Sequence, residues 1–491
     1  MPAAVVVGGG IGGLAAALAL YRIGWRVTVL ERAPEFREVG AGLALWPNAM
    51  RALAVLGLSE QVRAIAAVET KGGVRHRTGR WLYRTDNADV ARRYGWPLLM
   101  VHRADLLRVL VAALPGEVLS AGAEVHDVAD LRGQDLVVGA DGVHSTVRRQ
   151  RWPHAGSPRY SGSTTWRTVT GPVPGLGAEG ALWWGRGERI GFAALPGGRY
   201  YCFAAARARA GGRDAHGEFM DRFGGWPDPL PRLLAAVQED AVLRHDVYYV
   251  PPLASYVSGR VVLLGDAAHA MDPTLGQGAG TALEDAVTLA ACLGTVPDVD
   301  AALARYDRAR RPRTQAIARR SARLGAAGLL TWAPAARLRD LAARLVPPAA
   351  LLRSMDPILR WTPPSPELLA PPTSPEPDPA AGRTSPEPLE RSTPPERDPE
   401  PVERRATPEG DPEPVERRAT SDPTVGRRTP GPASQKSDPV VGWRAPEPAE
   451  RPATPDLAAR PSELRERGKT SPPPVARSAS SERGERGRDH A

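Results

Sequence analysis

The segment "AVVVGGGIGGLAAALALYRIG" near the amino terminus limits the fold most narrowly, because an apolar run meets a glycine-rich turn and then a helical pattern. Gly8, Gly10 and Gly13 have the spacing G-x-G-x-x-G at this turn. In such a turn the first glycine permits the tight bend, the second lets a pyrophosphate approach the backbone, and the third lets helix and strand pack closely. A second strand pattern, "WRVTVLER", follows Gly24. The unit predicts an α/β, Rossmann-like framework with a dinucleotide site at the helix start.

Glu31 ends this second strand pattern. A carboxylate at that position can accept a hydrogen bond from a ribose hydroxyl and disfavours a ribose 2′-phosphate. The first site therefore favours FAD or NAD over NADP.

Two further strand patterns end in Gly and Asp residues. The first is "DLVVGADGVHSTVRR", with Asp141 and Gly142, and Asp141 could equally be a simple helix cap. The second is "GRVVLLGDAAHAMDPTLGQGAG", in which Asp266 ends a strand and a turn leads to a helix from about Thr281. Three such strand ends suggest one extended polar ligand that is contacted by distant parts of the chain.

The rest of the chain shows three different sequence patterns. From about Ser157 to Pro252, short strand-like runs separated by glycines predict an inserted antiparallel sheet. The arginine-rich stretch "ALARYDRARRPRTQAIARRSARLG" has helical spacing and is interpreted as a surface helix with a charged face. After Thr362 come 29 of the 51 prolines and a repeated "DPEPVERRAT", which predicts disorder because little apolar surface can be buried. Its "SPPPVAR" is a candidate site for binding other proteins.

Composition excludes several classes of function. The first 362 residues hold 44 basic and 32 acidic groups, but the arginines are scattered, so we expect no nucleic-acid partner. Cys202 and Cys292 are the only cysteines, which excludes a disulfide framework and a cysteine-rich metal site and fits a cytoplasmic protein. The uncharged run from Ala3 to Leu20 contains too many glycines for a membrane-spanning or signal segment.

The three motifs, in this order, resemble those of the class A flavoprotein monooxygenases, the FAD-dependent aromatic hydroxylases with the para-hydroxybenzoate hydroxylase fold. "GAGLALWPNAMRALAVLGL" and "YDRARRPRT" resemble the salicylate-hydroxylase-like members, and the similarity covers about residues 2–330. It implies a discontinuous FAD-binding domain (1–70, 98–156 and 253–345), a substrate-binding β-sheet domain (71–97 and 157–252), a helical C-terminal part and a disordered tail (363–491). Relatives usually have a longer β-meander where this chain has only "EVHDVADLRGQD".

The resemblance also implies roles for individual residues. Gly8, Gly10 and Gly13 would bind the FAD pyrophosphate, and Glu31 the adenosine ribose, with Arg32 beside it. Ala41 and Gly42 would lie along the flavin side, and Arg103 would contact FAD, unless it is merely an exposed charge at a helix start. Asp141 and Gly142 match a fingerprint for FAD and NAD(P)H. Asp266 would bind ribityl or ribose hydroxyls, while the isoalloxazine would lie against Pro273, Gly276, Gln277, Gly278 and Ala279. No metal is implied.

The chemistry implied is reduction of non-covalent FAD by NADH or NADPH, followed by reaction with O2. The resulting C4a-hydroperoxyflavin would hydroxylate a small aromatic or polyketide-like substrate. Arg189 and Tyr201 lie where some urate-hydroxylating relatives have an Arg and a Tyr, so they are candidates for orienting substrate. A surface arginine and a packed tyrosine are the alternatives. Thr274 replaces the acid of those relatives, which argues against urate.

The sequence is also compatible with other functions. A flavin-dependent dehydrogenase or oxidase would share the cofactor frame, and so would a non-catalytic flavin-binding protein. His269 is tempting as a base, although nothing in the sequence directs it toward a substrate. Trp166, Trp183 and Trp184 suit either an aromatic ligand or a sheet core.

Overall fold

A computed structural model describes residues 1–36, 41–212 and 214–369 of the 491-residue chain. The predicted β-α-β start is present as β1 (Ala3–Val7), α1 (Ile11–Arg22) and β2 (Arg26–Glu31), and Gly24 has the positive φ of +85° that ends the helix turn. A six-stranded sheet follows the order β15 (Val257–Ser258), β16 (Val261–Leu263), β9 (Leu136–Gly139), β1, β2 and β8 (Leu119–Ala121). All its pairs are parallel except β15 with β16.

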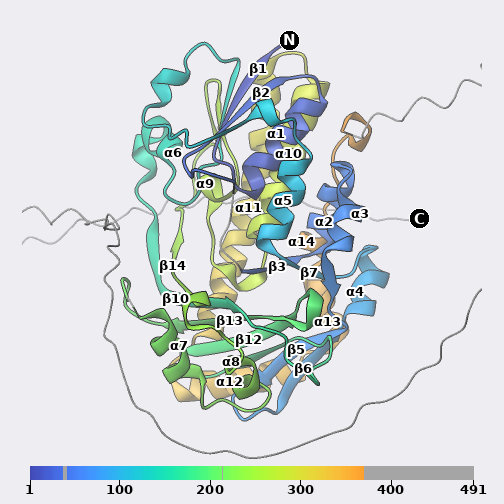
Figure 1. Ribbon diagram of the computed structural model, residues 1–491, viewed down its shortest axis with the longest axis vertical. Helices are drawn as coiled ribbons and strands as arrows, with labels where there is room; N and C mark the ends of the chain where they lie inside the picture. Colours follow the sequence, from blue (N-terminus) through green and yellow to red (C-terminus); the bar gives the residue numbers. More distant parts are fainter. Residues whose placement is uncertain (37–40, 213, 370–491) are drawn as a thin grey trace, which may run out of the picture. The chain divides into compact units, whose positions relative to one another are not determined.

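Helices α1 and α10 (Gly278–Thr295) pack against each other, and α2 (Pro47–Val55) and α11 (Val299–Gly328) pack on α10 (Figure 1). The alanines and leucines of α1 are almost wholly buried, which explains why this helix reads as a continuous apolar run. The remaining helices of this part are α3 (Ser59–Ala64), α5 (Arg103–Ala112), α6 (Thr146–Arg151) and α9 (Gly265–His269). A short three-stranded antiparallel sheet has the order β3 (Gly42–Leu45), β7 (Leu99–His102) and β4 (Ala66–Val68).

The inserted sheet has seven strands, in the order β14 (Leu243–Tyr249), β10 (Arg159–Val169), β13 (Tyr200–Arg207), β12 (Glu188–Ala194), β11 (Ala181–Trp184), β5 (Lys71–His76) and β6 (Trp81–Asp86). Every pair is antiparallel except β5 with β11. One face is covered by α7 (Ala215–Phe223) and α8 (Leu230–Leu234), around Trp166 and Trp183, which are fully buried. These two tryptophans are therefore core residues. The α/β class with an inserted, mainly antiparallel sheet is confirmed.

The C-terminal part is helical, as expected, with α12 (Ala333–Leu345), α13 (Pro348–Ser354) and α14 (Asp356–Leu359), while α4 (Asn87–Tyr94) lies beside β6. Described structure extends past the predicted start of the tail at residue 363, because the turn η7 (Pro366–Leu368) is followed by Leu369, which is buried. Arg22 donates to the Leu369 carbonyl over 2.9 Å. The remainder of the predicted tail, 370–491, lies outside the described residues.

Residues 302–325 form part of α11, whose exposed side is charged, as expected of a surface helix, but whose buried side also carries polar residues that periodicity does not predict. Arg310, Thr314 and Ser321 are buried along that side, and Arg310 is only 1% exposed. A helix of 30 residues can hold both a solvated face and a buried polar stripe when the stripe meets carboxylates on a neighbouring helix. Among the residues described, no helix combines the length and apolar composition needed to cross a membrane.

Candidate active site

Two glycines of the first turn are packed against neighbouring backbone, and a third has free space around it. A Cβ at Gly13 would lie 1.9 Å from the Gly8 carbonyl oxygen, and one at Gly8, where φ is +110°, would lie 2.5 Å from that of Ala140. A Cβ at Gly10 would meet no atom within 4 Å. Gly8 and Gly13 therefore let α1 start close against the sheet, and Gly10 leaves backbone accessible at the turn.

Glu31 lies beside the same turn. Its carboxylate accepts from the Gly9 N–H over 2.6 Å and from the Ala33 N–H over 2.9 Å. Arg32 next to it is exposed. The acid that ends β2 is thus held at the glycine turn, as the strand register predicts.

Asp141 and Gly142 follow β9. One carboxylate oxygen of Asp141 accepts from the N–H groups of Thr146 and Val147, at 2.7 and 3.1 Å, so the side chain does cap α6. The other oxygen is buried with no hydrogen-bond partner within the described part of the chain. A buried carboxylate oxygen without a donor is costly, so this oxygen is suited to accept a hydrogen bond from a polar group of a ligand.

The third segment is a pair of turns. Asp266 is in the first turn of α9 rather than at the strand end, and its side chain is exposed. After η6 (Pro273–Leu275), Gly276 adopts a left-handed φ of +60°, and α10 begins at Gly278, three residues earlier than expected. The amino-terminal end of α10, an 18-residue helix, therefore lies directly after the turn of Pro273 and Gly276. This end carries backbone N–H groups without helical partners and the positive end of the helix dipole.

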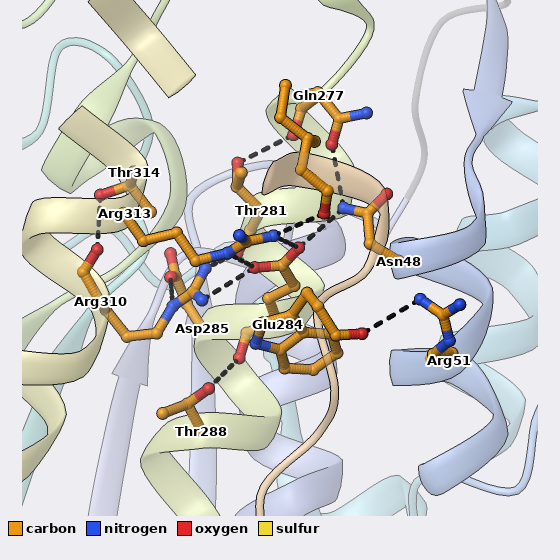
Figure 2. Close-up of polar contacts among 12 residues, drawn as sticks. Asn48, Arg51, Gln277, Thr281, Glu284, Asp285, Thr288, Arg310, Arg313 and Thr314 are labelled. Carbon is orange, nitrogen blue, oxygen red and sulfur yellow. Dashed lines mark hydrogen bonds and ion pairs between the residues drawn. The ribbon is translucent and has the colours of Figure 1, made fainter. Parts of the chain in front are cut away.

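Gln277 differs from its neighbours, because its side chain is buried and accepts from the Asn48 amide over 2.9 Å (Figure 2). Asn48 also donates to Glu284 over 2.7 Å, and Glu284 pairs with Arg310 and Arg313. This buried chain of polar groups fixes the start of α10 against α2 and α11. The Gln277 amide oxygen belongs to that support, whereas its Nε2 is buried with no hydrogen-bond partner among the described residues.

His269 belongs to the same support. Its Nε2 lies 2.6 Å from Asp285, whose carboxylate also accepts from Arg310 over 2.6 Å and from the Gly265 N–H over 3.0 Å. Burial alone would raise the pKa of Asp285, but His269 and Arg310 lower it below its ordinary value. The carboxylate thus remains ionised and ties the turn before α9 to α10 and α11.

A cleft of about 490 Å³ brings the three strand ends together with the seven-stranded sheet. Of the residues that the sequence singles out, it is lined by Gly10, Gly42, Arg103, Gly142, Arg189, Tyr201, Asp266, Pro273, Gly276, Gly278 and Ala279. The lining leaves out Gly8, Gly13, Glu31, Arg32, Ala41, Asp141 and Gln277. Ala41 is instead buried, with its carbonyl accepting from the Arg103 N–H over 2.8 Å.

Arg189 and Tyr201 form the sheet side of the cleft. The Arg189 guanidinium donates to the Thr274 hydroxyl over 2.7 Å, and only 7% of the residue is exposed. Burial lowers the pKa of Arg189, and Asp272, 3.9 Å away, opposes this shift. Burial likewise raises the pKa of Tyr201, whose ring packs so closely on β3 that a Cβ at Gly42 would lie 2.2 Å from it.

Glu69 and Arg167 also line the cleft, and sequence reasoning missed both. Burial raises the pKa of Glu69 to about 7. Its carboxylate would lie within 2.6 Å of a Cβ at either Gly72 or Gly180, so only glycines leave room for it. The signal in the sequence is "ETKGG", an acid two residues before the glycine-containing strand β5. Within the described ranges, no cluster of His, Cys, Asp and Glu is arranged to hold a metal ion.

Comparison with known proteins identifies the same architecture. The model of the "FAD binding domain" family matches residues 2–134 and 132–321. The aurachin C monooxygenase/isomerase of Stigmatella aurantiaca is 37% identical over 360 residues, which cover 70% of this chain and 94% of that protein. The 3-amino-4-hydroxybenzoate 2-monooxygenase of Streptomyces cremeus is 36% identical over 65% of this chain and 86% of its own length. The structure of Klebsiella pneumoniae HpxO with FAD and uric acid superposes with a TM-score of 0.67 at 26% identity, covering 73% of this chain and 96% of that one.

Proposed function

This chain belongs to the FAD binding domain family and is an FAD-dependent monooxygenase, and from that premise we propose that it hydroxylates a small aromatic or polyketide-like substrate with O2 and NADH or NADPH. The observation that carries the proposal is the cleft itself. It runs without interruption from Gly10 at the dinucleotide turn to Arg189 and Tyr201 on the inserted sheet. One ligand can therefore lie along the turns while a second lies under the sheet.

The described residues fit FAD at both ends of the cleft. Gly10 and Gly142 have no atom within 4 Å of an added Cβ, so they leave the volume that a cofactor backbone contact needs, and the orphaned oxygen of Asp141 needs a donor. In the proposal, Gly8, Gly10, Gly13 and Glu31 hold the adenosine and pyrophosphate end, with Arg32 at its edge. Asp141, Gly142 and Arg103 hold the middle of the cofactor.

The flavin end would be held by Asp266, Pro273, Gly276, Gly278 and Ala279, with Ala41, Gly42 and the buried Gln277 supporting that wall. Oriented N–H groups at the start of α10 stabilise a negative charge near the helix terminus without needing a side chain. Met100, Leu275 and Phe203 contribute apolar surface to the cleft and limit the access of water.

When bound, FAD supplies the electron transfer and oxygen activation of this reaction class. Arg189 and Tyr201 are proposed to orient the substrate. The Arg189 guanidinium is fixed by Thr274 and keeps further N–H groups for an oxygen atom of the substrate. Because Arg167 lines the same wall, the cleft favours a ring that carries an acidic oxygen.

The proposal is tested with a panel of phenols, hydroxybenzoates and hydroxyquinolines, by following NADH or NADPH oxidation and the incorporation of isotopically labelled O2 into product. For a substrate found in this way, R189Q should lower kcat/KM at least about 10-fold, because a buried donor to the substrate is lost. The matched variant R186Q changes an exposed arginine on the same hairpin and should leave kcat/KM unchanged. Equal substrate stimulation in R189Q, with FAD content and melting temperature retained, would remove Arg189 from the site. Labelled oxygen recovered as hydrogen peroxide, and in no product across the whole panel, would contradict the monooxygenase assignment.

A further inference from the structure

The large apolar side chains that are exposed on this protein concentrate in one short part of the chain. Within the described residues, six of the ten lie between residues 324 and 346: Leu324, Trp332, Leu338, Leu341, Leu345 and Val346. Trp332, Leu338 and Leu345 are 69%, 67% and 71% exposed. Large apolar side chains that are exposed together on a folded protein mark an interaction site.

Helix α12, which holds the three exposed leucines, faces the protein with its polar side. Leu338, Leu341 and Leu345 are spaced three and four residues apart and share its outer face, whereas Ala336, Arg339 and Asp340 are on the inner face. Arg339 donates to the carbonyls of Gly328 and Gly185, each over 3.2 Å, and its guanidinium lies 4.9 Å from the Trp184 ring centre. The helix is therefore held by an arginine and presents its leucines outward, the reverse of an ordinary surface helix.

The charges around this face are of one sign. From Arg308 to Met355 the only acidic residue is Asp340, and its carboxylate already pairs with Arg339 at 2.7 Å. Arg337 and Arg344 each precede one of the exposed leucines and are themselves exposed, and so is Arg323 next to Leu324. A partner for this face must accept apolar side chains at its centre and supply negative charge around them.

We propose that the outer face of α12 docks on an anionic lipid bilayer. Leucines on one face of a short helix enter the boundary between headgroups and acyl chains, while adjacent arginines meet lipid phosphates. A symmetric contact between two copies through this face would bring Arg337 and Arg344 of each copy together without acidic partners. Charge complementarity therefore favours lipid over a second copy. The association is peripheral, because the helix lies along the surface.

The test is co-sedimentation of the full chain, loaded with FAD, with phosphatidylcholine vesicles that contain or lack phosphatidylglycerol. The wild type should bind the anionic vesicles, bind neutral vesicles more weakly, and be released by salt. The triple variant L338Q/L341Q/L345Q should lose at least about 10-fold in affinity, because each leucine contributes apolar burial. The variant R337Q/R344Q should lose about 10-fold on anionic vesicles only.

The matched control Y21Q/V68Q removes two exposed apolar side chains from α1 and β4 and should bind as the wild type does. All variants should keep wild-type FAD content, since none of the residues touches the cleft. Three results would overturn the proposal: a wild-type chain that ignores anionic vesicles, a triple variant that binds them equally well, and equal binding to neutral and anionic vesicles. A wild-type dimer in sedimentation velocity that the triple variant dissolves would also overturn it, by assigning the face to a second copy.

Discussion

At the residue scale, Gly10 is a position where a larger side chain should affect FAD binding but not folding. The G10A side chain would meet no protein atom, so the FAD-free protein should keep its stability, whereas the methyl group would project into the space proposed for FAD. We expect G10A to weaken FAD binding at least about 10-fold, since a pyrophosphate must approach this backbone closely. Fluorescence titration of the FAD-free protein measures it. G116A, at a second glycine with open surroundings and outside the cleft, is the control, and wild-type FAD affinity in G10A would contradict the site.

Glu69 gives a pH-dependent prediction. Its pKa in the folded protein, about 7, is above the ordinary value of 4.5, so the folded state holds the proton more tightly than the unfolded state does. Stability should therefore fall as pH rises from about 4.5 to 7 and stay reduced above 7, by on the order of 3 kcal/mol. E69Q, which cannot ionise, should gain stability relative to the wild type between pH 5 and pH 8. Denaturant unfolding of both proteins at pH 5 and at pH 8 checks this prediction. If the difference in unfolding free energy between E69Q and the wild type is the same at the two pH values, the Glu69 carboxyl is not buried in solution.

The sequence identified the residues whose role depends on backbone spacing and missed those whose role depends on distant packing. Gly8, Gly10 and Gly13 could be predicted because strand, turn and helix are local. Glu69 could not, since Gly180, which leaves room for its carboxylate, is more than one hundred residues away. The sequence alone does not decide whether Asp141 caps a helix or contacts a ligand, because one of its oxygens caps α6 and the other is unpartnered within the described residues.

At the scale of elements, α9, α10 and α11 depend on one buried ionic network. Arg310 pairs with Asp285 at 2.6 Å and with Glu284 at 2.8 Å, and all three side chains are buried (Figure 2). R310Q would leave two buried carboxylates short of a cation and should cost about 3 to 5 kcal/mol of unfolding free energy. Because Asp285 also holds the Gly265 N–H, FAD should dissociate more readily as well.

The neighbouring variant R311Q is the control for this network. Arg311 pairs with Asp307 at 3.1 Å near the surface, so its loss should cost less than about 1 kcal/mol. Chemical denaturation of the two variants gives the comparison, and equal losses would contradict the network's role. Periodicity predicted helices α10 and α11 correctly, but it could not tell that Arg310 faces inward, because the pairing carboxylates are on another helix.

At the scale of the whole molecule, the order of three strand ends along the chain predicted that they would meet at one ligand. The described cleft does join Gly10, Gly142 and Asp266, because parallel strands bring their carboxyl ends to one edge of the sheet. The family resemblance implies that residues 71–97 belong with the inserted sheet, but the parallel pairing of β5 with β11 could not be predicted, since the paired strands lie more than one hundred residues apart. The division of the chain into FAD-binding and substrate-binding domains remains a prediction, as does the role of residues 370–491.

The most direct test of oxygen transfer mixes the full chain, reduced without oxygen, with oxygenated buffer in a stopped-flow spectrophotometer. We expect the flavin absorbance to return in two phases, through a species with its own spectrum, because the largely apolar cleft limits the access of water to the reacting ring. A substrate from the panel should accelerate the second phase. A single-phase return of oxidised flavin, with and without candidate substrates, would contradict oxygen transfer and favour a dehydrogenase or oxidase.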